Sequence, residues 1–170
     1  AFDRVDANRL LSVLQAQGVH PQVFKLLSSW LEDRSATVIV DGTRSAPFLL
    51  RNSVFQGTVL GPPLWNTFFE SARQPVNQCG YKEAVFADDL VAHKVFESGA
   101  SDRMLEDSMK ECQAALHRWG AASRVCFDAG KEQMFIIDKQ RPSGESFKML
   151  GVLFDTRLSM AKAVHQIAGQ

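Results

Sequence analysis

The sequence lacks a net charge, a paired-cysteine motif and a long apolar run, and each absence argues against a class of protein. Its 19 Lys and Arg residues balance 19 Asp and Glu residues, so no overall positive charge marks it as a nucleic-acid-binding domain. Its three cysteines, Cys79, Cys112 and Cys126, form no CxxC pair, which argues against a disulfide framework and a structural zinc site. No stretch approaches the roughly 18 apolar residues of a membrane span. We therefore expect an intracellular protein, in the nucleus or the cytoplasm, without membrane contact.

What remains is an ordinary globular composition, with 45% hydrophobic and 22% charged residues. This composition is too apolar for a disordered chain, and 170 residues suit one domain. The chain begins Ala1-Phe2-Asp3 without an initiator methionine. We expect one unit over residues 1–170 that starts inside a longer open reading frame.

Hydrophobic periodicity and breaker residues predict an α+β domain. Asp6 and Ser101 are suitable N-caps, and Gly120 is a suitable helix end. Trp30, Trp65 and Trp119 fall on apolar helix stripes, which favours a core role over base stacking. The predicted helices cover residues 6–17, 21–31, 64–75 and 101–120, with a further helix starting at 161. The predicted strands cover 36–40, 46–50, 84–86, 90–92, 134–137 and 149–154, the first two joined by the turn at 41–42.

Two adjacent carboxylates, Asp88 and Asp89, lie between the apolar runs 84–86 and 90–92. Neighbouring carboxylates repel one another, and a bound divalent cation removes that repulsion. Hard oxygen ligands of this kind suit Mg²⁺, which keeps several waters and binds substrate phosphates. A solvated Asp-rich turn is the alternative, and the spacing alone does not decide between them.

Five sequence phrases occur in an order that resembles one family across nearly the whole chain. They are Ala1-Phe2-Asp3-Arg4-Val5, Val54-Phe55-Gln56-Gly57-Thr58-Val59-Leu60-Gly61-Pro62, Phe86-Ala87-Asp88-Asp89, Cys126-Phe127-Asp128-Ala129-Gly130-Lys131 and Lys148-Met149-Leu150-Gly151-Val152. In this order they resemble the reverse transcriptase domain of LINE-type, non-LTR retrotransposons.

The resemblance implies a fold, an activity and partners. The fold would be a right-hand polymerase palm, a small antiparallel sheet backed by helices, with truncated fingers and thumb. The activity would be RNA-directed DNA polymerisation, a nucleotidyl transfer assisted by two Mg²⁺ ions. The partners would be an RNA template, a DNA primer, deoxynucleoside triphosphates and the rest of a larger retrotransposon polyprotein.

The resemblance also implies roles for individual residues. Asp88 would be a catalytic metal ligand and Asp89 its catalytic and metal-binding companion. The nucleotide-binding residues would be Phe2, Gln56, Gly57 and Lys131, with Phe2 closing against the sugar and Lys131 lying near the triphosphate. Leu150 and Gly151 would grip the primer end.

Departures from the family pattern leave alternatives open. The family has another metal-binding Asp a few residues before the position of Phe2, upstream of this chain, so we expect the segment alone to be inactive. Ser53, Phe55 and Thr58 replace the usual Gly, Pro and Ser of the middle loop, and Asp128 replaces a common Asn near Lys131. One alternative is a degenerate or domesticated remnant that acts as a non-catalytic RNA-contact or scaffold module. Another is a different palm enzyme, such as an intron maturase or a telomerase-like protein.

Overall fold

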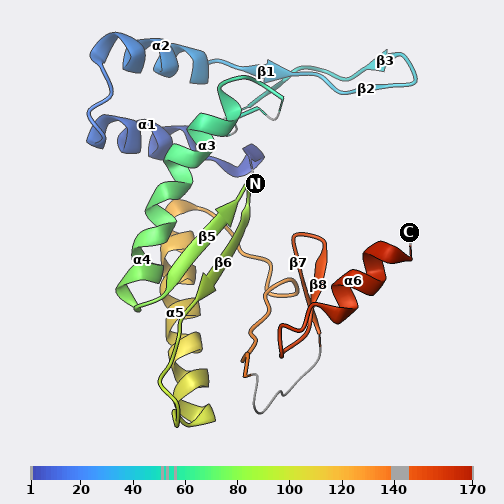
Figure 1. Ribbon diagram of the computed structural model, residues 1–170. Coiled ribbons are helices and arrows are strands. Elements are labelled where there is room, and N and C mark those ends of the chain that lie inside the picture. Colours follow the sequence, from blue (N-terminus) through green and yellow to red (C-terminus); the bar gives the residue numbers. More distant parts are fainter. Residues whose placement is uncertain (1, 51, 53, 56, 139–145, 170) are drawn as a thin grey trace.

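The computed structural model describes residues 2–50, 52, 54, 55, 57–138 and 146–169, and it combines helices with short antiparallel strands (Figure 1). The helices are α1 (Ala7–Ala16), α2 (Pro21–Leu31), α3 (Gly61–Phe69), α4 (Arg73–Gln78), α5 (Asp102–Ser123) and α6 (Ala161–Ala168), with 3₁₀ turns η1 (Phe2–Arg4) and η2 (Glu70–Ala72). Within the described residues the strands pair as β1 (Ser35–Ala36) with β4 (Phe48–Leu49), β2 (Ile39–Val40) with β3 (Thr43–Arg44), β5 (Lys82–Phe86) with β6 (Asp89–His93), and β7 (Phe147–Met149) with β8 (Val152–Phe154).

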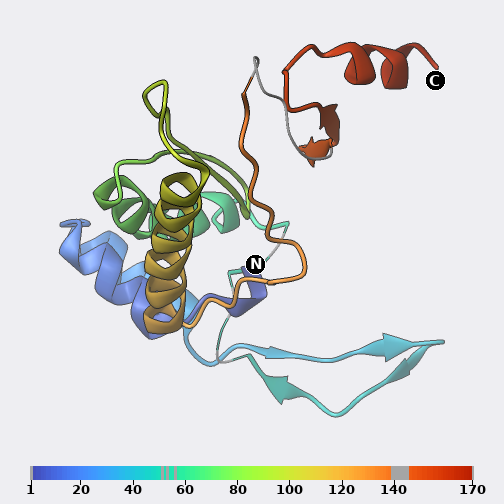
Figure 2. The same ribbon diagram turned by 90° about the horizontal axis from the view of Figure 1, so that it is seen from below.

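The expected α+β character is therefore confirmed at a coarse level. The expected small antiparallel sheet takes the form of separate two-stranded sheets in the described part of the chain. Figure 2 shows the ribbon of β1 to β4 extending away from the helices, and the β7–β8 hairpin with α6 set apart from α1 to α5. No helix in the described ranges is long and apolar enough to cross a membrane.

Local capping signals explain the helix starts. The Asp6 carboxylate accepts a hydrogen bond from the Arg9 backbone N–H at 2.9 Å, which satisfies one free donor at the start of α1. Ser101 does the same for α5 by accepting from the Met104 N–H at 3.3 Å. Pro21 is the first residue of α2, where its missing N–H costs nothing.

Helix boundaries differ from the sequence prediction at two places. Pro75 does not end a helix; it lies in the first turn of α4, where no intrahelical donor is needed. Gly120 does not end α5, which continues to Ser123 and ends where Arg124 takes a left-handed conformation, φ +58°. The Val125 N–H then donates to the Gly120 carbonyl at 2.8 Å and satisfies an acceptor of the last turn.

The predicted C-terminal strands also differ. Residues 134–137 pair with no described strand, and the Phe135 ring instead stacks on Phe147 with centroids 4.3 Å apart. The predicted strand 149–154 is interrupted, because Leu150 and Gly151 form a tight turn between β7 and β8. Both turn residues have positive φ, +48° and +84°, which an extended strand does not permit.

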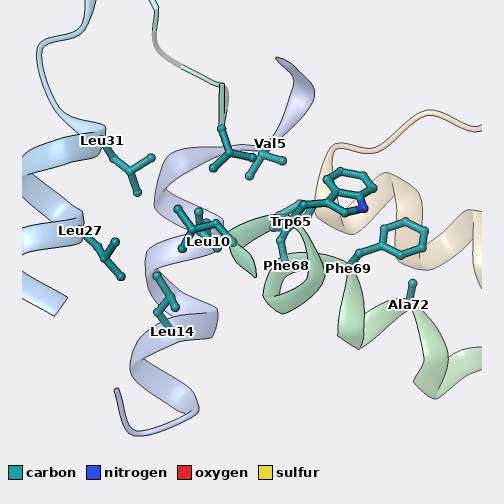
Figure 3. Close-up of a cluster of buried hydrophobic side chains, with 11 residues drawn as sticks. Val5, Leu10, Leu14, Leu27, Leu31, Trp65, Phe68, Phe69 and Ala72 are labelled. Atoms are coloured by element: carbon teal, nitrogen blue, oxygen red, sulfur yellow. The ribbon is translucent and has the colours of Figure 1, made fainter. Parts of the chain in front are cut away.

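The main hydrophobic core lies where α1, α2 and α3 meet (Figure 3). The buried side chains are those of Val5, Leu10, Leu14, Leu27, Leu31, Val54, Leu64, Trp65, Phe68, Phe69 and Ala72. A second cluster of Val76, Tyr81 and Cys112 joins α4 to α5 beneath β5 and β6. The β5–β6 hairpin thus packs against the helices α4 and α5.

Candidate active site

Asp88 and Asp89 lie at the turn between β5 and β6. The strands pair from Lys82 with His93 to Phe86 with Asp89, so Ala87 and Asp88 are the two turn residues. Both carboxylate-bearing residues are exposed. Ala87 has φ +54°, a left-handed conformation that costs a residue with a Cβ about 1–2 kcal/mol. The carboxylates therefore project from a short, backbone-restricted turn.

A buried tryptophan holds this turn from α3. The Trp65 indole N–H donates to the Ala87 carbonyl oxygen at 2.7 Å. Trp65 is only 2% exposed, and its ring stacks on Phe69 with centroids 5.0 Å apart. The hydrogen bond therefore links the metal-binding candidates to the main core and not only to their own strands.

Phe2 packs against the same tryptophan. Its ring centroid is 5.3 Å from that of Trp65, and the side chain is half-buried. The Phe2 carbonyl also accepts from the Val54 N–H at 3.0 Å, which ties it to the segment leading to Gly57. Trp65 thus contacts both the Phe2 ring and the Ala87 carbonyl that precedes Asp88, and Val54 links Phe2 to the start of the middle loop.

The middle loop ends in a turn built by a hydroxyl. Thr58 Oγ1 donates to the Phe55 carbonyl at 2.8 Å and accepts from the Gly61 N–H at 3.1 Å at the start of α3. A Cβ at Gly57 would meet no heavy atom within 4 Å, and φ there is +88°. The positive φ therefore favours glycine at position 57, although a side chain there would have room. Gln56, predicted beside it, lies outside the described residues.

The donor chemistry of the turn fits a hard divalent cation. Mg²⁺ sites in proteins commonly use one or two carboxylates and complete the coordination with waters and phosphates. Asp88 and Asp89 supply such carboxylates, while the described residues contain no cluster of three or more His, Cys, Asp or Glu side chains. Asp6 is not a substitute, since its carboxylate binds the Arg9 N–H and the Arg124 guanidinium at 2.9 and 2.6 Å.

Lys131 lies in a turn fixed to the C-terminal half of α5. Its backbone N–H donates to the Asp128 carbonyl at 2.8 Å, and its side chain is exposed. The next residue, Glu132, accepts from Gln113 at 2.5 Å and pairs with His117 at 2.7 Å. Among the described residues no ion pair joins Asp128 to Lys131, and no hydrogen bond or ion pair joins Lys131 to Asp88. Hydrogen bonds between Glu132 and α5 hold the segment that carries Lys131, but in the part of the chain that the structure describes no such contact joins Lys131 to Asp88 or Asp89.

Leu150 and Gly151 form the tip of the β7–β8 hairpin. Leu150 is 55% exposed, and a Cβ at Gly151 would meet no heavy atom within 4 Å. Within the described ranges no hydrogen bond or ring contact connects this tip to the β5–β6 turn. Figure 1 and Figure 2 show the hairpin and α6 set apart from the other helices.

Sequence reasoning missed the second role of Trp65. Its place on an apolar stripe correctly predicted a core residue, and the core assignment is confirmed by its burial. The hydrogen bond to Ala87 spans 22 residues of sequence and leaves no local signal. A buried tryptophan usually has an acceptor for its N–H, so the sequence predicts that such an acceptor exists but does not identify it.

Comparisons with known proteins agree on one family. A family profile described as reverse transcriptase (RNA-dependent DNA polymerase) matches residues 1–154. The chain is 32% identical over 136 residues, 77% of its length, to "RNA-directed DNA polymerase from mobile element jockey" of Drosophila funebris. It is 26% identical to the jockey protein of Drosophila melanogaster and 31% identical to "Probable RNA-directed DNA polymerase from transposon X-element" of that species, each over 98% of the chain.

The chain spans only a part of these relatives: 14% of the Drosophila funebris protein and 20% of each of the other two. No solved structure matches the chain.

Proposed function

Because this chain belongs to the reverse transcriptase family, we propose that residues 1–170 are a palm domain for RNA-templated DNA synthesis within a larger non-LTR retrotransposon protein. The observation that carries the proposal is the convergence on Trp65 of the Ala87–Asp88 turn, by a 2.7 Å hydrogen bond, and the Phe2 ring, at 5.3 Å. One buried side chain thus contacts the Phe2 ring, which the family pattern assigns to the nucleotide, and the peptide group that precedes Asp88, which it assigns to the metal.

Asp88 and Asp89 would hold Mg²⁺ in this proposal. When bound, such ions activate the primer 3′ hydroxyl and neutralise charge on the phosphates during in-line displacement. The restricted turn serves this role, because a carboxylate that is already oriented loses little entropy on binding a cation and a triphosphate.

The remaining residues would orient the nucleic acid and the incoming nucleotide. The Phe2 ring closes against the sugar and disfavours a 2′ hydroxyl, while the open backbone at Gly57 permits close approach of the nascent base pair. Gln56 belongs to the same loop by its place in the sequence. Lys131 lies near the triphosphate once substrate is bound, and Leu150 with Gly151 contacts the primer end.

The test is primer extension by the natural full-length protein that contains these residues, on an RNA template with deoxynucleotides and Mg²⁺. Asp88→Asn removes one negative charge and relieves repulsion with Asp89, so the fold is kept or slightly stabilised while extension falls by about 100-fold or more. Asp107→Asn is the matched control, because Asp107 is an exposed carboxylate of α5 that pairs with Arg103. It leaves extension unchanged.

Near-normal extension by Asp88→Asn would overturn the site. A folded full-length wild-type protein that binds RNA but extends no primer would overturn the catalytic function and favour the non-catalytic RNA-contact module.

A further inference from the structure

The β5–β6 turn needs support from outside its own hairpin. A two-stranded hairpin is marginally stable in water, and every residue from Ala84 to Asp89 is exposed. Ala87 moreover has positive φ at a position where tight hairpin turns favour glycine. Without contacts from other elements, such a turn samples several conformations and does not hold Asp88 in one orientation.

The strands are supported by packing, since Leu90 of β6 lies against both core clusters, and the turn itself is supported by one indole N–H. A tryptophan side chain has a single donor, and that of Trp65 is directed to the Ala87 carbonyl at 2.7 Å. The ring is 2% exposed and packs among Phe2, Phe68 and Phe69, with centroids 5.3, 6.2 and 5.0 Å away. A donor fixed by so much packing restrains the peptide group that directly precedes Asp88.

The same ring supports Phe2. The two rings are tilted at 31°, and the Phe2 carbonyl is held independently by the Val54 N–H. The position of the Phe2 ring therefore depends on the position of Trp65. One side chain thus restrains both the carboxylate turn and the ring assigned to the nucleotide sugar.

We propose that Trp65 is a positioning residue: its N–H sets the orientation of the Asp88 turn, and its ring sets the position of Phe2. The inference rests on the proposed function for its catalytic consequences. Losing the N–H raises the Mg²⁺ concentration needed for half-maximal extension about three- to tenfold, the range that one net hydrogen bond contributes. Losing the ring additionally weakens discrimination against ribonucleotides.

Trp65→Phe removes the donor and keeps an aromatic ring. Trp119→Phe is the matched control, because the Trp119 N–H donates to Ser71 Oγ at 3.0 Å and its ring contacts Phe69 in the same core, 5.4 Å away. Replacing Trp65 by 3-benzothienylalanine, which has sulfur in place of the N–H, tests the hydrogen bond at unchanged shape if Trp65→Phe does not fold. Trp65→Leu removes the ring.

The first measurement is amide hydrogen exchange over residues 84–91 in the full-length protein. We expect exchange about three- to tenfold faster in Trp65→Phe or the sulfur isostere, and unchanged exchange there in Trp119→Phe. Equal exchange in the Trp65 variants and the wild type would overturn the positioning role, whether or not the protein extends primers.

The second measurement is extension as a function of Mg²⁺ and of the sugar. The expected result is a raised Mg²⁺ requirement for Trp65→Phe and a relaxed sugar preference for Trp65→Leu alone. The same losses in Trp119→Phe would assign the effect to general core packing and refute the inference. A wild-type protein without extension would refute the proposed function, while the exchange result would still decide the role of Trp65.

Discussion

Replacing Gly120 by alanine should destabilise the protein, although the same change in most helices is stabilising. This glycine lies three residues before the end of α5, on the side that faces the segment carrying Lys131. A Cβ at Gly120 would lie 2.7 Å from the Val125 carbonyl oxygen and 2.9 Å from the Phe127 ring. The first neighbour is backbone held by the Val125 hydrogen bond, so it cannot simply rotate away.

The magnitude follows from two opposing effects. In an open helix position Gly→Ala stabilises by roughly 0.8–1 kcal/mol, because alanine loses less backbone entropy on folding. Forcing an extra carbon into packed surroundings costs about 1–3 kcal/mol. At Gly120 the contacts are well inside van der Waals distance, so the clash outweighs the entropy gain and Gly120→Ala lowers the free energy of unfolding by up to about 2 kcal/mol.

Urea unfolding followed by tryptophan fluorescence measures this change. Ala114→Gly, on the exposed side of α5, is the control for helix propensity and costs about 1 kcal/mol. An increase in stability of Gly120→Ala would refute the close approach of Val125 and Phe127 to the helix. A decrease supports it.

Two further predictions concern groups away from the turn. Asp6→Ala removes both the cap on the Arg9 N–H and the partner of Arg124, so it lowers the free energy of unfolding by about 2 kcal/mol in a urea titration. Asp6→Asn keeps a capping oxygen and costs less; equal losses would contradict the capping role. Burial raises the pKa of the Cys112 thiol to about 11, whereas Cys126 is exposed. Iodoacetamide at neutral pH therefore modifies Cys126 first in the folded protein, and mass spectrometry that finds Cys112 modified first would contradict the packing of α4 on α5.

Local chemistry made part of the fold predictable. The caps at Asp6 and Ser101 and the proline at the start of α2 act on neighbours within one helical turn, and the structure confirms all three. The hairpin around Asp88 was equally local, since two apolar runs flank a short polar turn. Such features depend on a few consecutive residues, and their predicted positions agree with the structure.

Tertiary contacts decided the rest. Gly120 has the sequence signature of a helix end, yet it serves as a gap that admits Phe127 against α5. Residues 134–137 have the composition of a strand, but a strand also needs a partner backbone, which no described segment offers them.

The site residues remain a prediction from the family pattern, and their arrangement in space has no signal in the sequence. The family pattern named Phe2 and Asp88, which lie far apart in the chain. Their common neighbour, Trp65, is identified only by the fold, through a hydrogen bond and a ring contact. Lys131 and the Leu150–Gly151 tip remain predictions, since no contact among the described residues joins them to the turn.

The proposed function requires a divalent metal ion at the β5–β6 turn, and iron-directed cleavage tests for one most directly. Fe²⁺ replaces Mg²⁺ in the full-length protein with primer, template and nucleotide bound, and ascorbate with peroxide then generates radicals that cut nearby backbone. Mass spectrometry should find cuts at residues 86–89 and near Phe2, absent with excess Mg²⁺ and absent in Asp88→Asn. Cuts confined to other segments, in a protein that extends primers, would contradict the account.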